Sequence, residues 1–518
     1  MRCANDLAKS FAKELEAVNL KYKATDLVAD ADTLHVESTG ASISELYESI
    51  RNASQNAEED LLLMHAILRF LERSFLKPST KLLNKSGENL IIELTLAGYL
   101  KNDSITFAQI DHITNLIIES NKLRVNLKKK YPTKQIKRWV IRPLASAIES
   151  SLVDHQRKQV LANLAYNYFL KAIDIKRLSE EKPSTYEATL YVAIEQVLLK
   201  NDPAFTRLNL INRYKISKTN TTQYAEFNQE IDSLFASDLL KQLNHIVDRN
   251  GAPFRILLHA IKNDSDLSSH IKTEKALIEV FDASIKASYL KINKDINRGI
   301  VRSVVFLIIT KFLAGIAMEV PYDLMVHGAV MWLPLTVNLA LPPLYMVLLR
   351  LTLIMPDAKN TKALTREISR ILYKEMPKKP FLGPSKRKFS YTYNILYALM
   401  VVGVFVGVSY LLINLAQFEW IHLVIFFVFI STASFLGFRL SRAIRSIEVG
   451  NEAQTSMTVL RDFLYMPFVV VGRHITETYS KLKIVSRFLD IFVELPLKHL
   501  LSFIRQWGVF MSEKKDEL

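Results

Sequence analysis

The sequence is poor in the residues on which several protein classes depend. Only one of its 518 residues is cysteine, Cys3, which excludes an internal disulfide framework and a cysteine-based structural zinc site. Only 14 residues are glycine, and no glycine-rich phosphate-binding motif occurs. The 11 histidines never stand three or four residues apart, the spacing at which two metal ligands share one helical face. These absences exclude the helical zinc-protease site and the common nucleotide-binding loops.

No arrangement of residues in the sequence indicates catalysis. The nucleophile motif G-x-S-x-G is absent. Acid–histidine neighbours such as Asp111-His112 occur, but adjacent residues on a helix point about 100° apart. We therefore predict that the protein is not an enzyme, with no catalytic residue, no metal and no cofactor.

The residues that are plentiful favour helix and membrane. Hydrophobic residues make up 49% of the chain, and the formal net charge is +15. With so little glycine, a chain rich in Leu, Ile, Lys, Glu and Ala favours an all-α fold. The positive charge suits nucleic acid, anionic lipid or an acidic protein. Hydropathy helps to choose among these partners, because four long apolar stretches between residues 304 and 438 indicate contact with a membrane. We predict a polytopic membrane protein.

We compared the length of each apolar stretch with the number of residues that a membrane-spanning helix needs. The hydrocarbon core of a bilayer is about 30 Å thick, which takes roughly 20 helical residues. The four predicted spans are Val304–Val320, Ala329–Leu349, Ile395–Phe418 and Trp420–Phe438. The third and fourth carry no charge. The second is also uncharged but contains Pro334, Pro342 and Pro343, which should kink or unwind it.

The charges that flank the spans predict the topology. Lys and Arg are frequent before the first span, between the second and third, and after the fourth, whereas residues 319–328 and 417–419 contain none. Because cytoplasmic loops carry the excess of basic residues, both termini should be cytoplasmic and the spans should form two hairpins. We place the protein in the plasma (inner) membrane, with the endoplasmic reticulum membrane as the alternative.

The last four residues, Lys515 to Leu518, resemble the retention signal of soluble endoplasmic reticulum proteins. A receptor reads that signal from the lumenal side, and the predicted topology keeps this end of the chain in the cytosol. We interpret the tetrapeptide as a chance match.

Apolar residues that recur every three or four positions predict helices on both sides of the spans. The tail repeats this pattern from Val485 to Trp507, with a break at Pro496, and could lie on the inner leaflet or against the N-terminal helices. The predicted divisions are a cytoplasmic helical region of one or two subdomains at 1–295, a first hairpin at 296–355, a basic loop at 356–393, a second hairpin at 394–440 and an amphipathic tail at 441–518.

One segment of the N-terminal region is strongly basic. Between Lys122 and Arg142 there are nine basic residues and no acidic one, with aromatic residues among them. Such a segment is either a solvated surface or a site for phosphates, and we favour anionic lipid over nucleic acid because the chain is already tethered to a membrane. The candidate lipid contacts are Lys128, Lys129, Lys130, Lys134, Lys137, Arg138 and Trp139.

Lys311 is the one cation deep within a predicted span. A lysine near the bilayer centre costs roughly 2.5–3.5 kcal/mol, so we expect its side chain to face the helix bundle. Candidate partners are Asn338 and Asn414, or backbone carbonyls that the prolines of the second span leave free. Glu319 lies eight residues along, about 80° around an α-helix, and is a poorer match. In the alternative, a short or tilted first span leaves Lys311 in water near the inner surface.

Two classes of function remain. The first is a membrane scaffold or interaction protein that presents its helical cytoplasmic region to an unknown cytoplasmic protein partner, and we favour it because over half of the chain precedes the spans. The alternative is a small channel or transporter with a polar path around Lys311, Asn338, Asn414 and the proline-rich second span. The sequence indicates neither a solute nor an oligomeric state.

Overall fold

The computed structural model describes residues 4–26, 32–36, 62–76, 83–153, 155–174, 183–374, 391–449, 456–482 and residue 507. Within these ranges there is no β-strand, only isolated bridge residues such as the pair Thr33 and Thr106, and all other regular structure is helical. The predicted all-α fold is confirmed. Residues 10–244 form one compact unit, the N-terminal unit, and residues 245–482 form a second together with the first nine residues.

The N-terminal unit is built from short helices around an apolar core. Its helices are α1 (Asp6–Asp26), α3 (Leu62–Leu76), α5 (Ser86–Leu96), α6 (Phe107–Lys128), α7 (Thr133–Ile136), the π-helix η2 (Lys137–Ile141), α8 (Arg142–Leu152), α9 (Gln156–Ala172), α11 (Pro183–Val197), α12 (Pro203–Arg213), α13 (Thr221–Ala236) and α14 (Asp238–Asn250), the first and last of which cross its boundary. Ile67, Leu90, Ile113 and Ile148 bring α3, α5, α6 and α8 together in one core cluster.

Polar residues fix where these helices begin. Thr106 and Gln109 form a capping box at the start of α6, in which each side chain bonds the other residue's backbone N–H. Asp202 accepts a hydrogen bond from the backbone N–H of Ala204 and so caps α12. The amphipathic pattern of the sequence and these caps together define the helical segments.

The second unit, which we call the membrane unit, contains the long apolar helices. Its helices are α15 (Ala252–Asn263), α16 (Leu267–His270), α17 (Glu274–Ala314), the π-helix η3 (Gly315–Glu319), α18 (Val320–His327), α19 (Trp332–Thr352), α20 (Ala358–Tyr373), α21 (Tyr391–Ala416), α22 (Trp420–Arg445) and α23 (Ser456–Leu482). Four stretches are long and apolar enough to cross a membrane: part of Glu274–His327, then Trp332–Thr352, Ile395–Ala416 and Trp420–Arg445. The four predicted apolar helices are therefore present.

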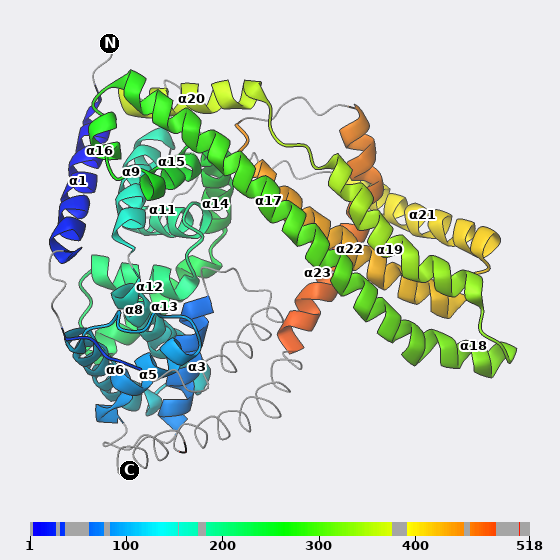
Figure 1. The fold of residues 1–518 in the computed structure, drawn as a ribbon, viewed down its shortest axis with the longest axis horizontal. Coiled ribbons are helices and arrows are strands. Elements are labelled where there is room, and N and C mark those ends of the chain that lie inside the picture. Colours follow the sequence, from blue (N-terminus) through cyan, green and yellow to red (C-terminus); the bar gives the residue numbers. More distant parts are fainter. Residues whose placement is uncertain are drawn as a thin grey trace, which may run out of the picture. The chain divides into compact units, whose positions relative to one another are not determined.

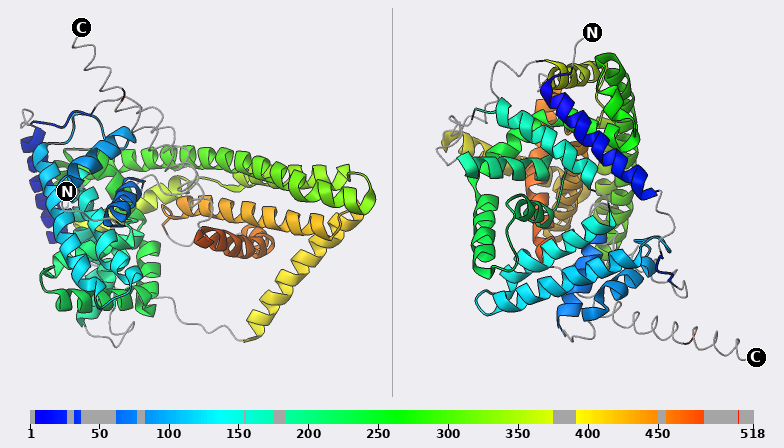
Figure 2. Two further views of the ribbon diagram at one scale, coloured as in Figure 1. Left: turned by 90° about the horizontal axis from the view of Figure 1, so that it is seen from below. Right: turned by 90° about the vertical axis from the view of Figure 1, so that its left-hand side faces the viewer.

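The first apolar stretch is part of a much longer helix. α17, η3 and α18 follow one another without a break from Glu274 to His327, and Figure 2 shows them as one rod. The predicted division near residue 295 therefore falls inside a continuous helix, and residues 245–295 belong to the same compact unit as the apolar helices.

α17, α19 and α22 pack against one another (Figure 1). Leu307, Met346 and Ala433, one from each of these helices, are fully buried in a shared core cluster. A side chain at Gly437 of α22 would meet the Leu349 side chain, so α19 and α22 approach closely at this glycine. α19 stays helical through Pro342 and Pro343, so the structure does not contain the unwound turn that was one of the two predicted outcomes there.

α23 packs against the middle of α22. The Tyr465 hydroxyl donates a hydrogen bond to the carbonyl of Ser434 at 2.8 Å, and the Phe468 ring stacks on Phe427 with centroids 6.3 Å apart. A Cβ on Gly472 would stand 1.9 Å from the Ser431 carbonyl oxygen, so only glycine allows this contact. Residues 463–472, which are too short to cross a membrane, thus join the apolar helices. The predicted amphipathic segment 485–507 lies outside the described residues except for Trp507.

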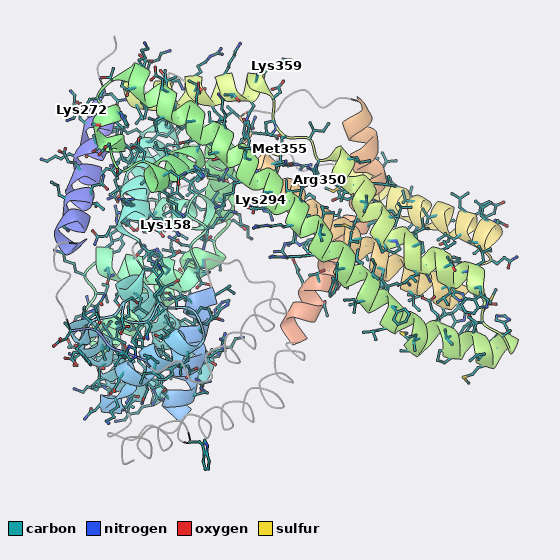
Figure 3. All side chains as sticks on the ribbon, in the orientation of Figure 1. Lys158, Lys272, Lys294, Arg350, Met355 and Lys359 are labelled. Carbon is teal, nitrogen blue, oxygen red and sulfur yellow. The ribbon has the colours of Figure 1, made fainter. Side chains whose placement is uncertain are left out.

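Polar side chains join α19 to α17 at the end remote from the α18–α19 turn. Figure 3 shows Arg350 at the end of α19 beside the part of α17 that carries Lys294. The Arg350 guanidinium donates to the side-chain oxygens of Asn293 at 2.7 Å and Asn297 at 2.6 Å. These bonds hold the two helices in register at the end where the basic residues gather.

Candidate functional site among the membrane helices

Five polar side chains are buried together in the membrane unit. They are Lys311 of α17, Glu319 at the end of η3, Asp323 of α18, Asn338 of α19 and His422 of α22, and each is at most 2% exposed. We call these five residues the buried polar cluster. Ionisable groups in an apolar helix bundle are costly to bury and are usually functional, which makes the cluster the candidate site.

Lys311 and Glu319 form a buried ion pair. The Lys311 ammonium donates to Oε1 of Glu319 at 2.9 Å. Judging Glu319 a poor partner for Lys311 was wrong, because that estimate assumed a regular α-helix. Gly315–Glu319 is a π-helix, whose turn takes about one residue more and so brings Glu319 back to about 20° from Lys311.

Asn338 links this pair to α22. Its amide Nδ2 donates to Glu319 Oε1 at 3.1 Å and to the backbone carbonyl of His422 at 3.2 Å. Pro342 lies four residues along α19 and has no N–H to give to the Asn338 carbonyl. α19 therefore presents both a side-chain amide and a backbone carbonyl without its helical partner at this level.

Asp323 and His422 form the second pair of the cluster. Asp323 Oδ2 accepts the backbone N–H of Met331 at 2.9 Å, and Oδ1 lies 3.2 Å from His422 Nε2, without the alignment of a hydrogen bond. His422 Nδ1 accepts the backbone N–H of Glu419 at 3.3 Å, within the capping box that begins α22. The imidazole is thus held by its helix end and directed at the carboxylate.

The cluster reaches the surface at the α18–α19 turn. Glu419 accepts a hydrogen bond from the Tyr322 hydroxyl at 2.8 Å and pairs with His327 Nε2 at 2.9 Å. Glu419 and His327 are each about one-third exposed, whereas Asp323, next to Tyr322 in the chain, is fully buried. Polar side chains therefore extend from the α18–α19 turn into the helix bundle.

Polar groups continue along α22 beyond Lys311. The Lys311 ammonium lies 4.8 Å from the centre of the Phe429 ring, within cation–π distance. Ser431 and Ser434 follow on α22 and are fully buried, and the Ser434 hydroxyl donates to the Tyr345 hydroxyl at 3.0 Å. The interior of the bundle is thus polar on both sides of the ion pair.

Several polar atoms of the cluster have no hydrogen-bond partner. They are Glu319 Oε2, Asp323 Oδ1, Asn338 Oδ1 and His422 Nε2, and the Ser431 hydroxyl shares this property. Buried polar groups in proteins are nearly always satisfied, and an unsatisfied one points to strain, water, an ion or a functional role. Here three acceptor oxygens gather within one site. The cluster is therefore equipped to take up a hydrogen-bond donor or a cation.

The three polar residues that the sequence predicted to lie within the membrane have different environments in the structure. Lys311 and Asn338 both contact Glu319. Asn414 instead lies on an exposed part of α21, where its amide donates to the carbonyl of Tyr410 on the same helix. Lys311 is only 2% exposed, and this burial does not agree with the alternative in which water surrounds its side chain.

The basic segment divides into an exposed part and an inward part. Its exposed cations are Lys122, Lys128, Lys129, Lys130, Lys134, Arg138 and Arg142. Lys137 pairs with Glu72 at 2.5 Å, and Arg138 pairs with Asp232. Trp139 is fully buried and its indole N–H donates to Asp232 at 2.9 Å. A buried side chain cannot contact lipid, so we withdraw Trp139 from the candidate contacts, and Lys137 and Arg138 have protein partners.

The N-terminal unit holds a buried carboxyl that the sequence gave no reason to select. Glu195 of α11 is fully buried and accepts hydrogen bonds from the amides of Asn201 at 2.5 Å and Asn209 at 3.2 Å. Burial raises the pKa of the Glu195 carboxyl, and the hydrogen bonds from these amides oppose that change. Its partners are all local polar side chains, which is typical of a structural network.

Sequence reasoning missed three members of the cluster as site residues: Glu319, Asp323 and His422. A signal was present, because Glu319 and Asp323 stand four residues apart, next to an otherwise apolar stretch. Glu319 lies at the end of the first predicted span, and Asp323 lies in the segment between the first two spans that contains no Lys or Arg. Over the described ranges, no group of three or more His, Cys, Asp or Glu side chains is arranged to hold a metal ion.

The chain matches no protein-family model, no curated protein and no solved structure. Its function is therefore inferred from the geometry of the site.

Proposed function

We propose that the membrane unit is a small channel or transporter whose path passes the buried polar cluster. The observation that carries this proposal is the linked burial of two carboxylates, an ammonium, an imidazole and an amide between apolar helices. Such groups are rare inside membrane helices and mark ion or substrate pathways. From the sequence we favoured a scaffold and kept a channel or transporter as the alternative. The geometry of the site supports that alternative better.

The unsatisfied atoms argue against a purely structural role. A buried ion pair stabilises a fold weakly at best, and a hydrophobic replacement is often neutral or stabilising. A structural network would satisfy its members, yet Glu319, Asp323 and Asn338 each retain a free acceptor oxygen. The π-helix adds to this argument, because single π turns within α-helices frequently occur at functional sites.

The orientation that we propose keeps both termini in the cytoplasm and the α18–α19 turn outside, in the plasma membrane. The basic residues of the loops support it. In this orientation the N-terminal unit is cytoplasmic, where its helices could present a surface to a protein partner. The scaffold function proposed from the sequence then becomes a second role of the same chain.

Cysteine accessibility in the full chain tests the proposed path. In a Cys3→Ser background, Asn338→Cys should react with a small charged thiol reagent, because a transport path must admit water to the cluster. Val406→Cys on α21 has a 61% exposed parent residue among apolar neighbours and should stay unlabelled if it faces lipid. Met325→Cys near the turn, with an 87% exposed parent, should react freely from the outer side.

These two control positions make the result decisive in either direction. Labelling at position 338 together with protection at 406 supports a water-filled path. If position 338 is as unreactive as position 406 from both sides while Met325→Cys reacts, the cluster is dry and the transport proposal fails.

We also propose that the exposed half of the basic segment contacts anionic lipid. Lys128, Lys129 and Lys130 follow one another at the end of α6, all exposed. Each lysine near an anionic surface contributes about 1 kcal/mol, so three in succession matter together. The proposal no longer relies on an aromatic residue, because Trp139 is buried.

A fluorophore on Thr133→Cys, in the Cys3→Ser full chain, would report this contact. In bilayer discs with anionic lipid, nitroxide-labelled headgroups should quench it, and high salt should reduce the quenching. Changing Lys128, Lys129 and Lys130 to Ala should abolish the quenching. The matched control removes the same charge from other exposed positions of the N-terminal unit: Lys101, Lys200 and Lys241. Equal quenching in both triple variants would show that the segment is merely solvated.

A further inference from the structure

The charges of the buried polar cluster do not balance. Glu319 and Asp323 supply two carboxyl groups, whereas Lys311 supplies a single ammonium. If all three are ionised and His422 is neutral, a net charge of −1 remains among side chains that are at most 2% exposed. A low-dielectric interior penalises such a charge heavily, so a positive charge must come from elsewhere.

His422 is poorly placed to supply that charge. Its Nδ1 accepts a backbone N–H from Glu419, which requires an unprotonated Nδ1. Neutral imidazole then carries its hydrogen on Nε2, the atom that faces Asp323. A proton on Nδ1 would point at the backbone N–H of Glu419, 3.3 Å away. The two N–H groups would repel each other, and the capping box of α22 would break.

The other groups that face the cluster do not add a cation to it. From α18, Tyr322 and His327 both direct their polar atoms to Glu419, which is itself acidic. α19 contributes the neutral amide of Asn338, and α22 contributes Phe429 and His422. Lys311 is the only ammonium or guanidinium group that contacts the described members of the cluster.

We infer that the cluster binds one exchangeable proton on its pair of carboxyl groups, Glu319 and Asp323, and that this proton is the ion for which the path is built. The inference rests on the proposed function and names its coupling ion. Water at the α18–α19 turn supplies the proton, a carboxylate oxygen forms one O–H bond, and hydroxide stays in solution. Glu319 Oε2 has no hydrogen-bond partner and is the oxygen available to it, whereas the Nε2–H of His422 already faces Asp323 Oδ1 at 3.2 Å.

A proton suits the site better than a metal cation. The Lys311 ammonium already lies 2.9 Å from one carboxylate and would repel a second cation held there. Glu319, Asp323 and His422, the acidic and histidine residues of the cluster, are also not arranged as a group that could hold a metal ion. A proton needs only one oxygen and no coordination shell.

Infrared spectroscopy of the purified full chain counts the protonated carboxyl groups through their carbonyl band, without any transport measurement. The measurement uses a Glu195→Gln background, which removes any contribution from the fully buried carboxyl of the N-terminal unit. At neutral pH the parent should show one buried carboxylic acid. Glu319→Gln and Asp323→Asn should each remove the band, since one carboxylate then balances one ammonium.

Lys311→Met gives the sharpest result. Without the ammonium both carboxyl groups must be neutral, so the band should double in area. The Lys311→Met/Glu319→Gln variant should return it to the parent area, and Asn414→Gln, an exposed change on α21, should leave it unchanged. No band in the parent, or a band that Lys311→Met leaves unaltered, overturns the proton site. Labelling at position 338 would still support the path in that case, so the two failures are distinguishable.

Discussion

Replacing Lys311 by Met should destabilise the membrane unit by about 3–5 kcal/mol, the range measured when one partner of a buried ion pair is removed. The loss is large because Glu319 stays fully buried with Oε2 unsatisfied and Oε1 reduced to its bond from Asn338. Hydrogen exchange of α17 and α19 in the full chain measures the change locally, which matters in a protein with two compact units.

The companion variants identify the cause. Lys311→Met/Glu319→Gln removes both charges but keeps a side chain that accepts the Asn338 amide, so it should recover most of the lost protection. Asn414→Gln alters a polar residue on an exposed part of α21 and should change nothing. If the double variant exchanges as fast as Lys311→Met alone, the loss comes from packing rather than from the unpaired carboxylate.

Hydropathy was sufficient to predict the coarse architecture. The four apolar stretches appear as helices in the structure, with bounds that differ by a few residues, because burial of backbone polar groups in an apolar stretch requires a helix. The sequence-based division near residue 295 falls within α17, since amphipathic and apolar segments of one helix differ in composition but not in backbone. Composition therefore indicates where the apolar helices lie, but it does not indicate where one compact unit ends and the next begins.

The partners within the site could not be predicted from periodicity alone. A count of 100° per residue separates Lys311 from Glu319, and only the π-helix at Gly315–Glu319 brings them together. Nothing in the local sequence marks a π turn, because its geometry depends on contacts with neighbouring helices. Asn338 is recognisable in the sequence as a polar residue of the second predicted span, but its contact with His422 joins segments 84 residues apart.

Trp139 shows the same limit in the N-terminal unit. Its position within a run of cations suggested an interfacial aromatic, yet the indole is buried against Asp232. Arg207, only 1% exposed, also bonds Asp232, so one carboxylate organises Trp139, Arg138 and Arg207. A run of charge along the sequence does not reveal which members point inward, because that depends on an acidic residue more than 90 positions away.

Proton flux should depend on the two carboxyl groups of the cluster. Protonation of Glu319 or Asp323 from the turn is a required step of the path, and an amide cannot accept that proton. Glu319→Gln and Asp323→Asn should therefore both lower the flux to the background of protein-free vesicles. Each variant keeps a polar side chain of nearly the same size, so the fold should tolerate the change better than it tolerates Lys311→Met.

The most direct test is the proton flux into sealed vesicles that contain the purified full chain, followed with a trapped pH indicator under an imposed potassium diffusion potential. The account predicts that wild-type and Asn414→Gln vesicles change pH faster than protein-free vesicles. It predicts the protein-free rate for Glu319→Gln and Asp323→Asn. A wild-type rate equal to that of protein-free vesicles, or an undiminished rate in Glu319→Gln, would contradict it.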